Sequence, residues 1–519
     1  MSDGLILSLD CGTQSFRAML FDKSGELLNI EKIHFEPYFS KEPGYAEQDP
    51  LLYWNSLCTA VKRLKEKYPE NFSRIIGVSL TTQRDTVIFL DKEGNHLRPA
   101  ILWLDQRMAK CEDPVPPIES AKFNIVGMKS TIEIVRRKSK ANWIKENEKE
   151  IWDKTYKVLL LSGYLTYKLT GKMVDSYANQ IGHIPFHYKK KSWPRSFKVY
   201  RYGMFGIERE KLPDLVSPGD IIGDISDEAS EETGISTDLK LIACGSDKGC
   251  ETLGTGCIDE TSVNLSFGTT ATAETTTKKY IEPIRFFPSY PSIIKDCYNP
   301  EIEIMRGYWM ISWFKKEFAQ REMLIASERN IAPEEILNKT LDTIPPGCQG
   351  LILQPFWGAS HKLPTAKGSV IGFGDVHTRA HLYKAIIEGI NYSLIDGVEK
   401  LEKKTKIKVE KILVSGGGSQ SDAICQITAD MFGRNVYKER TYETSGLGAA
   451  INAFVALGVY KNFKEAADNM VHYKKVFKPD IRNVQIYRDL YTRVYKNIYK
   501  KLKGLYDEIQ DITGYPEVY

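Results

Sequence analysis

Apolar and polar residues form short alternating blocks along the chain, and the first blocks predict a β-hairpin. Residues 5–9 are mostly apolar, 11–15 form a small polar turn with glycine, and 18–21 are apolar again. Two such runs joined by a short glycine turn are typical of paired strands. Asp10 stands where the first predicted strand meets the turn.

The order of strand and glycine turn recurs further along the chain. Residues 261–270 read TSVNLSFGTT, an apolar run that ends in glycine and two threonines. Residues 411–418 read KILVSGGG and precede 421–431, where apolar residues recur at helical spacing. A longer helical pattern covers 380–402. These blocks predict two strand systems, each followed by helices.

One carboxylate, Asp247, follows a short apolar strand at 239–244. Gly245 and Ser246 interrupt that strand, and a helix-like stretch begins after them. A carboxylate at a strand end can take a proton from an attacking hydroxyl, and glycine lets a ligand approach the backbone closely. The same residue can also serve as a cap for the following helix. The local sequence leaves both roles open.

The first hairpin carries residues that suit phosphate groups. Backbone N–H groups of the turn, with the hydroxyls of Thr13 and Ser15, can face phosphate oxygens. Arg17 can add charge-assisted hydrogen bonds, and Asp10 can hold a cation beside the phosphates. An ordinary hairpin with an Asx turn has the same residues. The chain contains neither a G-x-x-x-x-G-K-[ST] loop nor a G-x-G-x-x-G motif that opens a strand–helix unit.

Nine segments in this order resemble the FGGY family of carbohydrate kinases, which shares the fold of actin, hexokinase and the heat-shock ATPases. Each segment is a weak signal alone, but together they extend over nearly the whole chain. They are DCGTQSFRAMLFD (10–22), GYAEQDPLLYW (44–54), GVSLTTQRDTVIFLDKEG (77–94), ILWLDQR (101–107), ACGSDKGCETLGTG (243–256), LSFGTTA (265–271), GFGDVHTRAHLYKAIIEGINY (372–392), VSGGGSQSDAICQITADMFGRNV (414–436) and ETSGLGAAINA (443–453).

The resemblance implies an α/β fold of two actin-like ATPase (ribonuclease H-like) domains. Each would be a mixed sheet flanked by helices, with an interdomain cleft. We expect an N-terminal FGGY domain over 1–258, which carries the sugar site and the catalytic base, and a C-terminal nucleotide-binding domain over 259–519. No low-complexity linker separates the two halves.

The resemblance also implies a reaction, the ATP-dependent phosphorylation of a hydroxyl on a sugar or polyol, with ATP and Mg²⁺ as cofactors. Asp247 falls at the family's catalytic position, and Asp10 falls where the metal is held. The expected nucleotide contacts are Thr13, Gln14, Ser15 and Arg17 in the first phosphate element, Gly268 and Thr269 in the second, and Gly417, Gly418 and Ser421 in the adenosine element.

The expected acceptor site contains Gln83, Arg84 and Asp85, which follow the apolar strand 75–80. An amide, a guanidinium and a carboxylate supply hydrogen-bond donors and acceptors to neighbouring hydroxyls. A surface turn with an internal ion pair has the same three residue types. Glycerol kinases carry a similar Gln-Arg-acid triplet, whereas xylulose kinases typically carry Gln-Met-His, so the triplet favours a polyol.

Two positions depart from the glycerol kinase pattern. Val135 stands about where those enzymes have a tyrosine near their substrate, and Lys248 stands where the family often has an amide. Plain glycerol is therefore disfavoured as the substrate. Trp103 and Asp105 match a W-x-D-x-R element of the family, which either borders the pocket or packs beside it.

Composition and charge agree with a globular enzyme. The chain has 519 residues, enough for two or more domains, and a net charge of +4 from 71 basic and 67 acidic residues, which indicates no nucleic-acid partner. Nine cysteines without a C-x-x-C pair indicate neither a disulfide framework nor a zinc site. No signal peptide and no apolar run of membrane length occur. We expect a cytoplasmic enzyme with a small-molecule partner, and a homodimer is possible.

Other functions share parts of this pattern. An actin- or chaperone-like ATPase would need neither the triplet 83–85 nor GYAEQDP. A non-catalytic sugar-sensing protein on the same fold would not need Asp10, Asp247 or the glycine elements. Among kinases, a ketose, a pentitol, a tetritol or a small signalling diol such as autoinducer-2 all remain open as acceptors.

Overall fold

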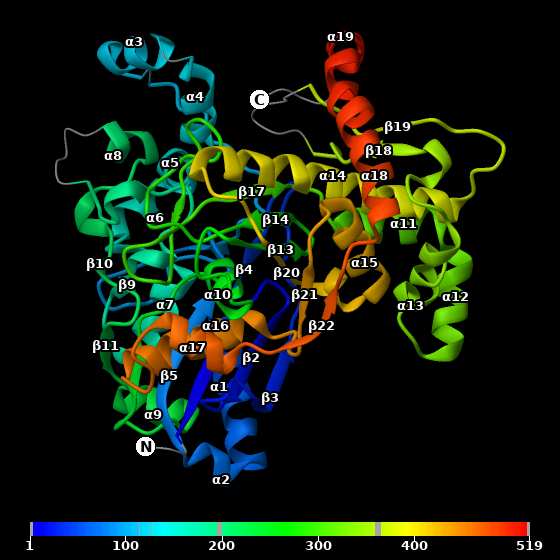
Figure 1. The fold of residues 1–519 in the computed structure, drawn as a ribbon. Coiled ribbons are helices and arrows are strands. Elements are labelled where there is room, and N and C mark those ends of the chain that lie inside the picture. The colour runs from blue at the N-terminus through cyan, green and yellow to red at the C-terminus, as the bar shows by residue number, and fades with distance from the viewer. Residues whose placement is uncertain (1–3, 114, 126, 195–199, 359–364, 516–519) are drawn as a thin grey trace. The chain divides into compact units, whose positions relative to one another are not determined.

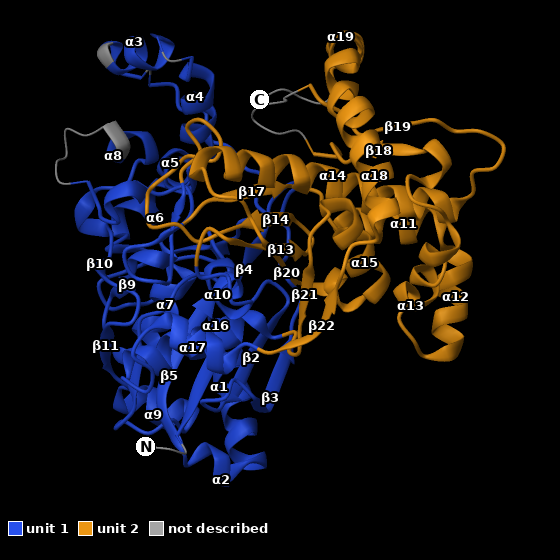
Figure 2. Cartoon of the chain, in the orientation of Figure 1, with its two compact units in different colours: residues 1–258, 289–298, 443–471 blue, residues 259–288, 299–442, 472–519 orange. Residues whose placement is uncertain are grey.

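The computed structural model describes residues 4–113, 115–125, 127–194, 200–358 and 365–515 (Figure 1). The chain forms two compact units, which Figure 2 shows in different colours. Unit 1 comprises Met1–Ile258, Ser289–Tyr298 and Glu443–Val471, and unit 2 comprises Asp259–Pro288, Asn299–Tyr442 and His472–Tyr519. One boundary therefore falls after residue 258, while two later segments pack with unit 1.

Unit 1 is built on a six-stranded mixed sheet. Its order is β11-β12-β5-β1-β2-β3, in which β1 runs parallel to β5 and antiparallel to β2. The predicted hairpin is β1–β2, with Asp10 paired across from Arg17. The strands are β1 (Leu5–Cys11), β2 (Ser15–Phe21), β3 (Leu27–His34), β5 (Ile75–Thr82), β11 (Ile221–Asp224) and β12 (Lys240–Ile242).

Helices cover both faces of this sheet. One face packs its leucines against α1 (Pro50–Lys67), α7 (Leu161–Thr170) and α9 (Asp227–Thr233). The other face packs against α10 (Asp247–Gly254), α16 (Thr444–Ala456) and α17 (Phe463–Met470). Because side chains alternate along a strand, Ser8 and Asp10 point to the α10 and α16 side, where the Ser8 hydroxyl donates to the carbonyl of Gly446 at 2.9 Å.

A second, four-stranded sheet of unit 1 has the order β4-β7-β6-β8. Its strands are β4 (Glu47–Gln48), β6 (Val87–Leu90), β7 (Ala100–Ile101) and β8 (Lys157–Leu160). The other elements of this unit are α2 (Pro69–Phe72), α3 (Pro117–Ile125), α4 (Lys129–Lys138), α5 (Lys140–Asn147), α6 (Lys149–Lys154), α8 (Tyr200–Phe205), β9 (Val174–Ser176), β10 (Asp214–Val216) and β15 (Tyr290–Pro291).

Unit 2 repeats the strand order of the main sheet. Its order is β17-β14-β13-β20-β21-β22, in which β13 runs parallel to β20 and antiparallel to β14. The expected duplication of strands followed by helices is thus present in the two sheets. The strands are β13 (Ser262–Phe267), β14 (Ala271–Glu274), β17 (Glu301–Ile304), β20 (Lys411–Ser415), β21 (Val436–Glu439) and β22 (Tyr473–Phe477).

The core of unit 2 lies between its sheet and a set of helices. The predicted helix at 380–402 is the central part of α14, and the predicted helix at 421–431 is α15. Both contribute buried side chains to one apolar cluster with the strands. The remaining elements are α11 (Trp309–Phe318), α12 (Gln320–Arg329), α13 (Pro333–Asn338), α14 (Arg379–Thr405), α15 (Asp422–Phe432), α18 (Ile481–Asp489), α19 (Lys496–Thr513), β18 (Ile352–Gln354) and β19 (Ser369–Ile371).

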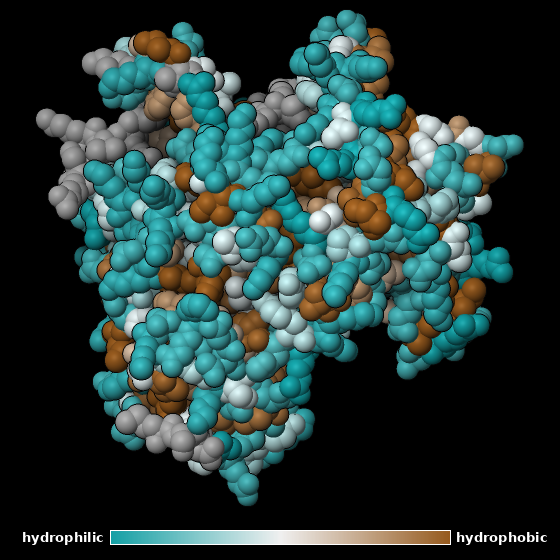
Figure 3. All heavy atoms as spheres, viewed as in Figure 1, coloured by the Kyte–Doolittle hydropathy of each residue, from teal (hydrophilic) through white to brown (hydrophobic). Residues whose placement is uncertain are grey.

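Each unit is thus a mixed sheet flanked by helices, as the sequence predicts. On the face shown in Figure 3, hydrophilic residues cover most of the surface and apolar residues gather in small separate groups. Among the helices that the structure describes, none is long and apolar enough to cross a bilayer.

Candidate active site

Three parallel strands of unit 1 end at one edge of the sheet, and the predicted catalytic and acceptor residues lie there. Asp10 pairs in register with Thr81, two residues before Gln83. The Thr81 hydroxyl donates to the carbonyl of Gly245 at 2.9 Å, which ties the end of β5 to the turn before Asp247. In α/β sheets of this kind, ligands bind outside the carboxyl ends of the strands.

Asp247 is the first residue of α10, but Ser246 is the residue that caps the helix. The Ser246 hydroxyl accepts from the N–H of Gly249 at 3.4 Å, so the helix start does not depend on the Asp247 carboxylate. That carboxylate is 30% exposed and lies 4.0 Å from Nε of Arg84. Burial raises its pKa, while Arg84 and Lys248 oppose the shift. A reachable carboxylate with increased proton affinity suits a general base.

Asp10 lies among charged groups on the α10 side of the sheet. Its side chain is almost fully buried and accepts from Nη1 of Arg17 at 2.9 Å. Burial raises the pKa of Asp10 to about 6; Arg17 opposes this shift, while Asp247 and Glu443 add to it. Nε of Arg17 also lies 3.1 Å from Glu443. Arg17 thus pairs with two carboxylates, Asp10 and Glu443, and carboxylate oxygens are ligands that a divalent cation prefers.

Sequence reasoning gave Glu443 no role. The signal that could have identified it is its position at the head of the ETSGLGAA segment. In the structure, Glu443 directly precedes α16 and pairs with Nε of Arg17, while Asp10 pairs with Nη1. Arg17, which we expected to contact phosphate, here links two carboxylates.

The turn between β1 and β2 faces the acceptor triplet. The Thr13 hydroxyl donates to Oε1 of Gln83 at 2.9 Å and accepts from Nε1 of Trp103 at 3.2 Å. Gln14 is exposed, whereas Ser15 is buried and its carbonyl accepts from the N–H of Gly12 at 3.0 Å. The hydroxyl of Thr13 therefore already has two partners, and Gln14 has the most accessible side chain of the turn.

Gln83 and Arg84 are enclosed and do not form a surface turn. Gln83 is 4% exposed, and its backbone N–H donates to the carbonyl of Cys11 at 2.9 Å. Arg84 donates from Nε to the Ser246 hydroxyl at 3.1 Å, and its guanidinium lies over the ring of Tyr290 at 5.0 Å. Arg84 is thus held beside Asp247 by a hydroxyl and an aromatic face.

Asp85 is paired with two residues that sequence reasoning missed, Lys140 and His183. Its Oδ2 lies 2.8 Å from Nζ of Lys140 and 2.8 Å from Nδ1 of His183, and its Oδ1 accepts from the N–H of His183 at 3.1 Å. Burial alone would raise the pKa of Asp85, but Lys140 and His183 outweigh it and hold that pKa well below its usual range. Asp85 is therefore an anion at neutral pH.

The W-x-D-x-R element has two different environments. The Asp105 side chain is 1% exposed and accepts two hydrogen bonds from the Arg107 guanidinium, both at 2.8 Å, so it stabilises local packing. The Arg107 guanidinium lies over the rings of Tyr45 and Trp143 at 3.9 and 4.6 Å. Trp103, by contrast, is 36% exposed and contacts Thr13.

The glycine elements of unit 2 follow two neighbouring parallel strands. Ser266 and Ser415 pair in register, so Gly268 and Gly418 lie just past the same edge. A Cβ on Gly418 would lie 2.4 Å from the ring of Tyr308, so only glycine fits there.

The rest of these elements is more open. A Cβ on Gly417 would meet no atom within 4 Å. Thr269 is exposed, and its carbonyl accepts from the N–H of Trp309 at 3.2 Å. Ser421 caps α15 by accepting from the N–H of Ile424 at 3.4 Å.

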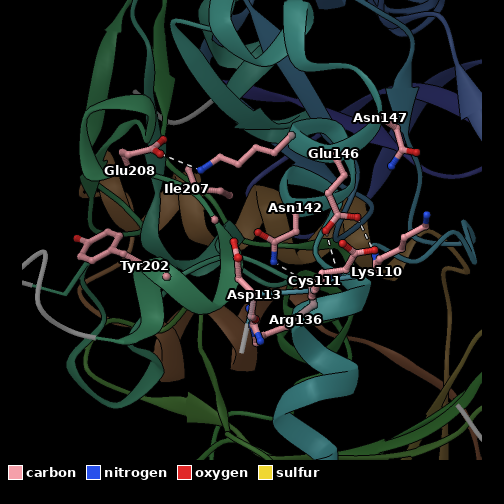
Figure 4. Close-up of a pocket in the computed structure, with 14 residues that line it drawn as sticks. Lys110, Cys111, Asp113, Arg136, Asn142, Glu146, Asn147, Tyr202, Ile207 and Glu208 are labelled. Carbon is pink, nitrogen blue, oxygen red and sulfur yellow. Dashed lines mark hydrogen bonds and ion pairs between the residues drawn. The ribbon is translucent and has the colours of Figure 1, made fainter. Parts of the chain in front are cut away.

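A cavity of about 710 Å³ lies elsewhere in unit 1, along α5 (Figure 4). None of the predicted site residues lines it. Its polar groups bind one another: Glu146 accepts from the N–H groups of Lys110 and Cys111 at 2.7 and 2.8 Å, and Lys145 donates to Glu208 at 2.9 Å. The described residues form no group of three or more side chains suited to a metal ion.

Comparisons with known proteins identify the class. The family model described as "FGGY family of carbohydrate kinases, N-terminal domain" matches residues 5–254, and the C-terminal domain model matches 263–457. The chain therefore belongs to the FGGY family of carbohydrate kinases. It is an ATP-dependent kinase that phosphorylates a hydroxyl of a sugar or polyol.

Individual relatives extend over almost the whole chain. A protein described as the uncharacterized sugar kinase YgcE of Escherichia coli (strain K12) is 28% identical over 96% of this chain and 94% of its own length. A xylulose kinase of Lactococcus lactis subsp. lactis is 27% identical over 98% and 99%. The ligand-bound xylulose kinase from Lactobacillus acidophilus has a similar fold, with a TM-score of 0.81, 24% identity and coverage of 97% and 99%.

These relatives do not favour an ATPase that acts on a protein, a sugar sensor without catalysis, or a kinase of a signalling diol. The expected family membership, α/β fold and enzyme class are confirmed. Sugar kinases of this family use ATP.

Proposed function

We propose that the enzyme transfers the terminal phosphoryl group of Mg-ATP to a hydroxyl of a ketose or polyol, with Asp247 as the general base. The observation that carries the proposal is the state of Asp247, a partly exposed carboxylate with a raised pKa, 4.0 Å from Arg84. In this role, Asp247 takes the proton of the acceptor hydroxyl as that oxygen attacks phosphorus. Arg84 keeps the base ionised and near the acceptor.

The residues around Asp10 fit a magnesium ion. The raised pKa of Asp10 reflects burial and the repulsion from Asp247 and Glu443, and a divalent cation would relieve that repulsion. When bound, Mg²⁺ neutralises charge on the phosphate oxygens of ATP. Asp10 would hold it, and Arg17 would keep the neighbouring carboxylates in place.

Residues proposed to contact the nucleotide occur in each unit. In unit 1, Gln14 and Arg17 belong to the first phosphate element, together with Thr13 and Ser15. In unit 2, the open Gly417 supports a close approach of the nucleotide to the backbone. The other residues proposed there are Gly268, Thr269, Gly418 and Ser421.

The acceptor is assigned to Gln83, Arg84 and Asp85. The relative named xylulose kinase favours a ketose, whereas the Gln-Arg-acid triplet favours a polyol. Both have adjacent hydroxyls, which the amide and guanidinium groups can bind. A five-carbon ketose or pentitol satisfies both lines of reasoning.

A substrate panel tests this proposal. Purified enzyme with Mg-ATP is supplied with ketoses, pentitols, tetritols, glycerol and sugar acids, and ADP release is measured. ADP release that depends on a ketose or polyol, and is lost in Asp247→Asn, is expected. ADP release at the same rate without any acceptor would contradict the proposal, and so would a preference for sugar acids alone.

A further inference from the structure

Asp85 has little capacity left to bind a substrate hydroxyl. Both of its carboxylate oxygens accept hydrogen bonds from His183, and Oδ2 also pairs with Lys140. The side chain of Asp85 is 14% exposed and that of Lys140 is 6% exposed, whereas that of His183 is 33% exposed. The imidazole is therefore the part of this triad that a small molecule can reach.

The loop that carries His183 leads back to Arg84 through a chain of contacts. Gly182 lies so close to Asp85 that a Cβ would be 2.4 Å from Oδ1. The Tyr188 hydroxyl donates to the carbonyl of Gly182 at 3.3 Å, and the Tyr188 ring lies 5.6 Å from that of Tyr290. Tyr290 in turn lies beneath the guanidinium of Arg84.

These contacts place His183 in one wall with the acceptor triplet. Arg84 and Asp85 are consecutive residues, and each is tied to the loop at 182–188, Asp85 directly and Arg84 through two tyrosines. Arg84 also lies 4.0 Å from Asp247. The loop is thus held beside the residues assigned to the reaction.

We propose that His183 is a specificity-determining residue that contacts a hydroxyl of the acceptor through Nε2, and that Asp85 and Lys140 are positioning residues that fix its ring. This inference rests on the proposed function. Asp85 takes the Nδ1 side of the ring, and among the described residues no hydrogen bond is made by Nε2. In the neutral ring Nε2 accepts from a hydroxyl, and in the charged ring it donates to the hydroxyl oxygen.

His183→Asn removes the proposed contact between Nε2 and the acceptor but keeps a polar group beside Asp85. Asparagine keeps a polar group near the position of Nδ1, within reach of Asp85, but it cannot reach the position of Nε2. Because the acceptor hydroxyl then lacks its hydrogen-bond partner, the KM for the acceptor is expected to rise about 10- to 100-fold. The kcat and the KM for ATP are expected to change less than about threefold.

Deoxy acceptors distinguish a direct contact from a structural role. If His183 binds one hydroxyl, the acceptor without that hydroxyl is a poor substrate for the parent enzyme. The same deoxy acceptor is then expected to be no worse than the full acceptor for His183→Asn. A purely structural role would penalise all acceptors equally and would leave the deoxy penalty unchanged.

His187→Asn is a matched control in the same loop. His187 accepts from the N–H of Lys190 at 3.3 Å, a bond that asparagine can also make, and it is not part of the Asp85 triad. It is expected to keep the parent's acceptor KM. Equal effects of the two variants, or an unchanged deoxy penalty in His183→Asn, would overturn the inference.

The outcome is separable from that of the proposed function. If the parent shows acceptor-dependent ADP release that Asp247→Asn lacks, the proposed function holds whatever His183→Asn does. A normal acceptor KM in His183→Asn would then overturn only the role of His183.

Discussion

At the scale of single residues, three aspartates of unit 1 show how surroundings assign chemistry. Burial raises the pKa of Asp247 and of Asp10, whereas Lys140 and His183 lower the pKa of Asp85. The first is suited to take a proton, the second to hold a cation, and the third to remain an anion that positions other groups. One residue type thus has three different pKa environments because its neighbours differ.

Asp247→Asn is expected to reduce kcat by roughly 10²- to 10⁴-fold, the usual contribution of a positioned general base. The KM values for acceptor and ATP should change little, because asparagine keeps the shape of the side chain. The free energy of unfolding at neutral pH should be equal or higher in the variant. A carboxylate whose pKa is raised in the folded state destabilises that state as pH rises and the group ionises, and asparagine does not ionise. Steady-state kinetics and thermal unfolding measure both effects.

The pH profile is the control for that variant. In the parent, kcat is expected to fall at acid pH as Asp247 becomes protonated, and the residual activity of Asp247→Asn should lack this acid limb. A variant within twofold of the parent, or an unchanged acid limb, would exclude Asp247 as the base.

Arg84→Ala is expected to reduce kcat/KM for the acceptor by about 10- to 100-fold, because a buried polar site is penalised when one partner is removed. The KM for ATP should change little, since Arg84 lies with the acceptor residues. Arg84→Lys retains the charge but loses the Nε bond to Ser246, so an intermediate loss is expected. Kinetics with each substrate varied in turn measure the split; an equal loss for ATP would assign Arg84 to the fold.

The sequence could predict the positions of Asp10 and Asp247 beside strand ends, but not the partners of Asp85. Asp10 ends a strand and Asp247 follows one closely, so apolar runs mark both positions. Lys140 and His183 are 55 and 98 residues from Asp85, and neither lies in a pattern that indicates pairing. The alternative that the sequence left open was an ion pair within the triplet, but Asp85 pairs with Lys140 and His183, which lie outside it.

At the scale of elements, two neighbouring glycines of unit 2 have different surroundings. Gly418 is required by packing, since any Cβ would meet the ring of Tyr308. Gly417 is not constrained by any neighbour. A requirement for glycine at 417 would therefore come from a ligand.

Gly417→Ala and Gly418→Ala are expected to separate these functions. Gly417→Ala should weaken ATP binding several-fold, with the free energy of unfolding within about 1 kcal/mol of the parent, because the added methyl group enters space that a ligand would use. Gly418→Ala should lower stability by about 1–3 kcal/mol, because a 2.4 Å contact forces the loop to shift. Isothermal ATP titration with chemical denaturation measures both. A normal ATP affinity in Gly417→Ala would remove that residue from the nucleotide site.

Lys140, at the start of helix α5, pairs with Asp85. The effect of removing the Lys140 charge on the free energy of unfolding is expected to depend on pH. Lys140→Met leaves Asp85 buried without its ammonium partner, which should cost about 3–5 kcal/mol at pH 7. The parent's Asp85 has a lowered pKa, so its ionised form stabilises the folded state above about pH 4, near the pKa of an unfolded aspartate. This stabilisation is lost progressively as pH falls below that value. In the variant the pKa of Asp85 is expected to rise, so the variant gains stability as pH falls.

The difference in the free energy of unfolding between the parent and Lys140→Met should therefore become smaller as pH falls from 7 to 4. Urea unfolding at several pH values measures it. Lys145→Met, on the same helix but paired with Glu208 at a half-exposed position, is the control and should cost less than about 1 kcal/mol at every pH. A difference that stays constant with pH would show that Asp85 is not the group responsible.

At the scale of the whole molecule, the two mixed sheets could be predicted before the structure, but the set of chain segments that makes up each unit could not. The apolar runs and glycine turn at the start of the chain predicted the first hairpin, and the family resemblance predicted the two mixed sheets. The return of 443–471 to unit 1 was not predicted. Helix α16 is buried on nearly all sides, and such a helix carries no stripe that indicates which sheet it joins.

The close packing of α16 makes a fragment of residues 1–258 incomplete. A Cβ on Gly448 would lie 1.9 Å from the carbonyl oxygen of Cys250, so α16 meets α10 at backbone distance. Leu447, Ile451 and Phe454 share an apolar cluster with β1 and β2. Burial of three such side chains stabilises unit 1 by about 6 kcal/mol, at roughly 1.5–3 kcal/mol each.

That amount is comparable to the entire stability of a typical domain, about 5–15 kcal/mol, so the fragment 1–258 is expected to unfold without a cooperative transition and to bind a hydrophobic dye. Joining 443–471 to it through a flexible glycine–serine linker should restore a single cooperative transition. The same fusion with Leu447→Asp, which puts a charge into the apolar cluster, is the control and should behave like the fragment. Calorimetry and dye fluorescence measure the outcome. Cooperative unfolding of 1–258 alone, at a midpoint close to that of the fusion, would mean that the N-terminal domain ends at residue 258 and that α16 is dispensable for its core.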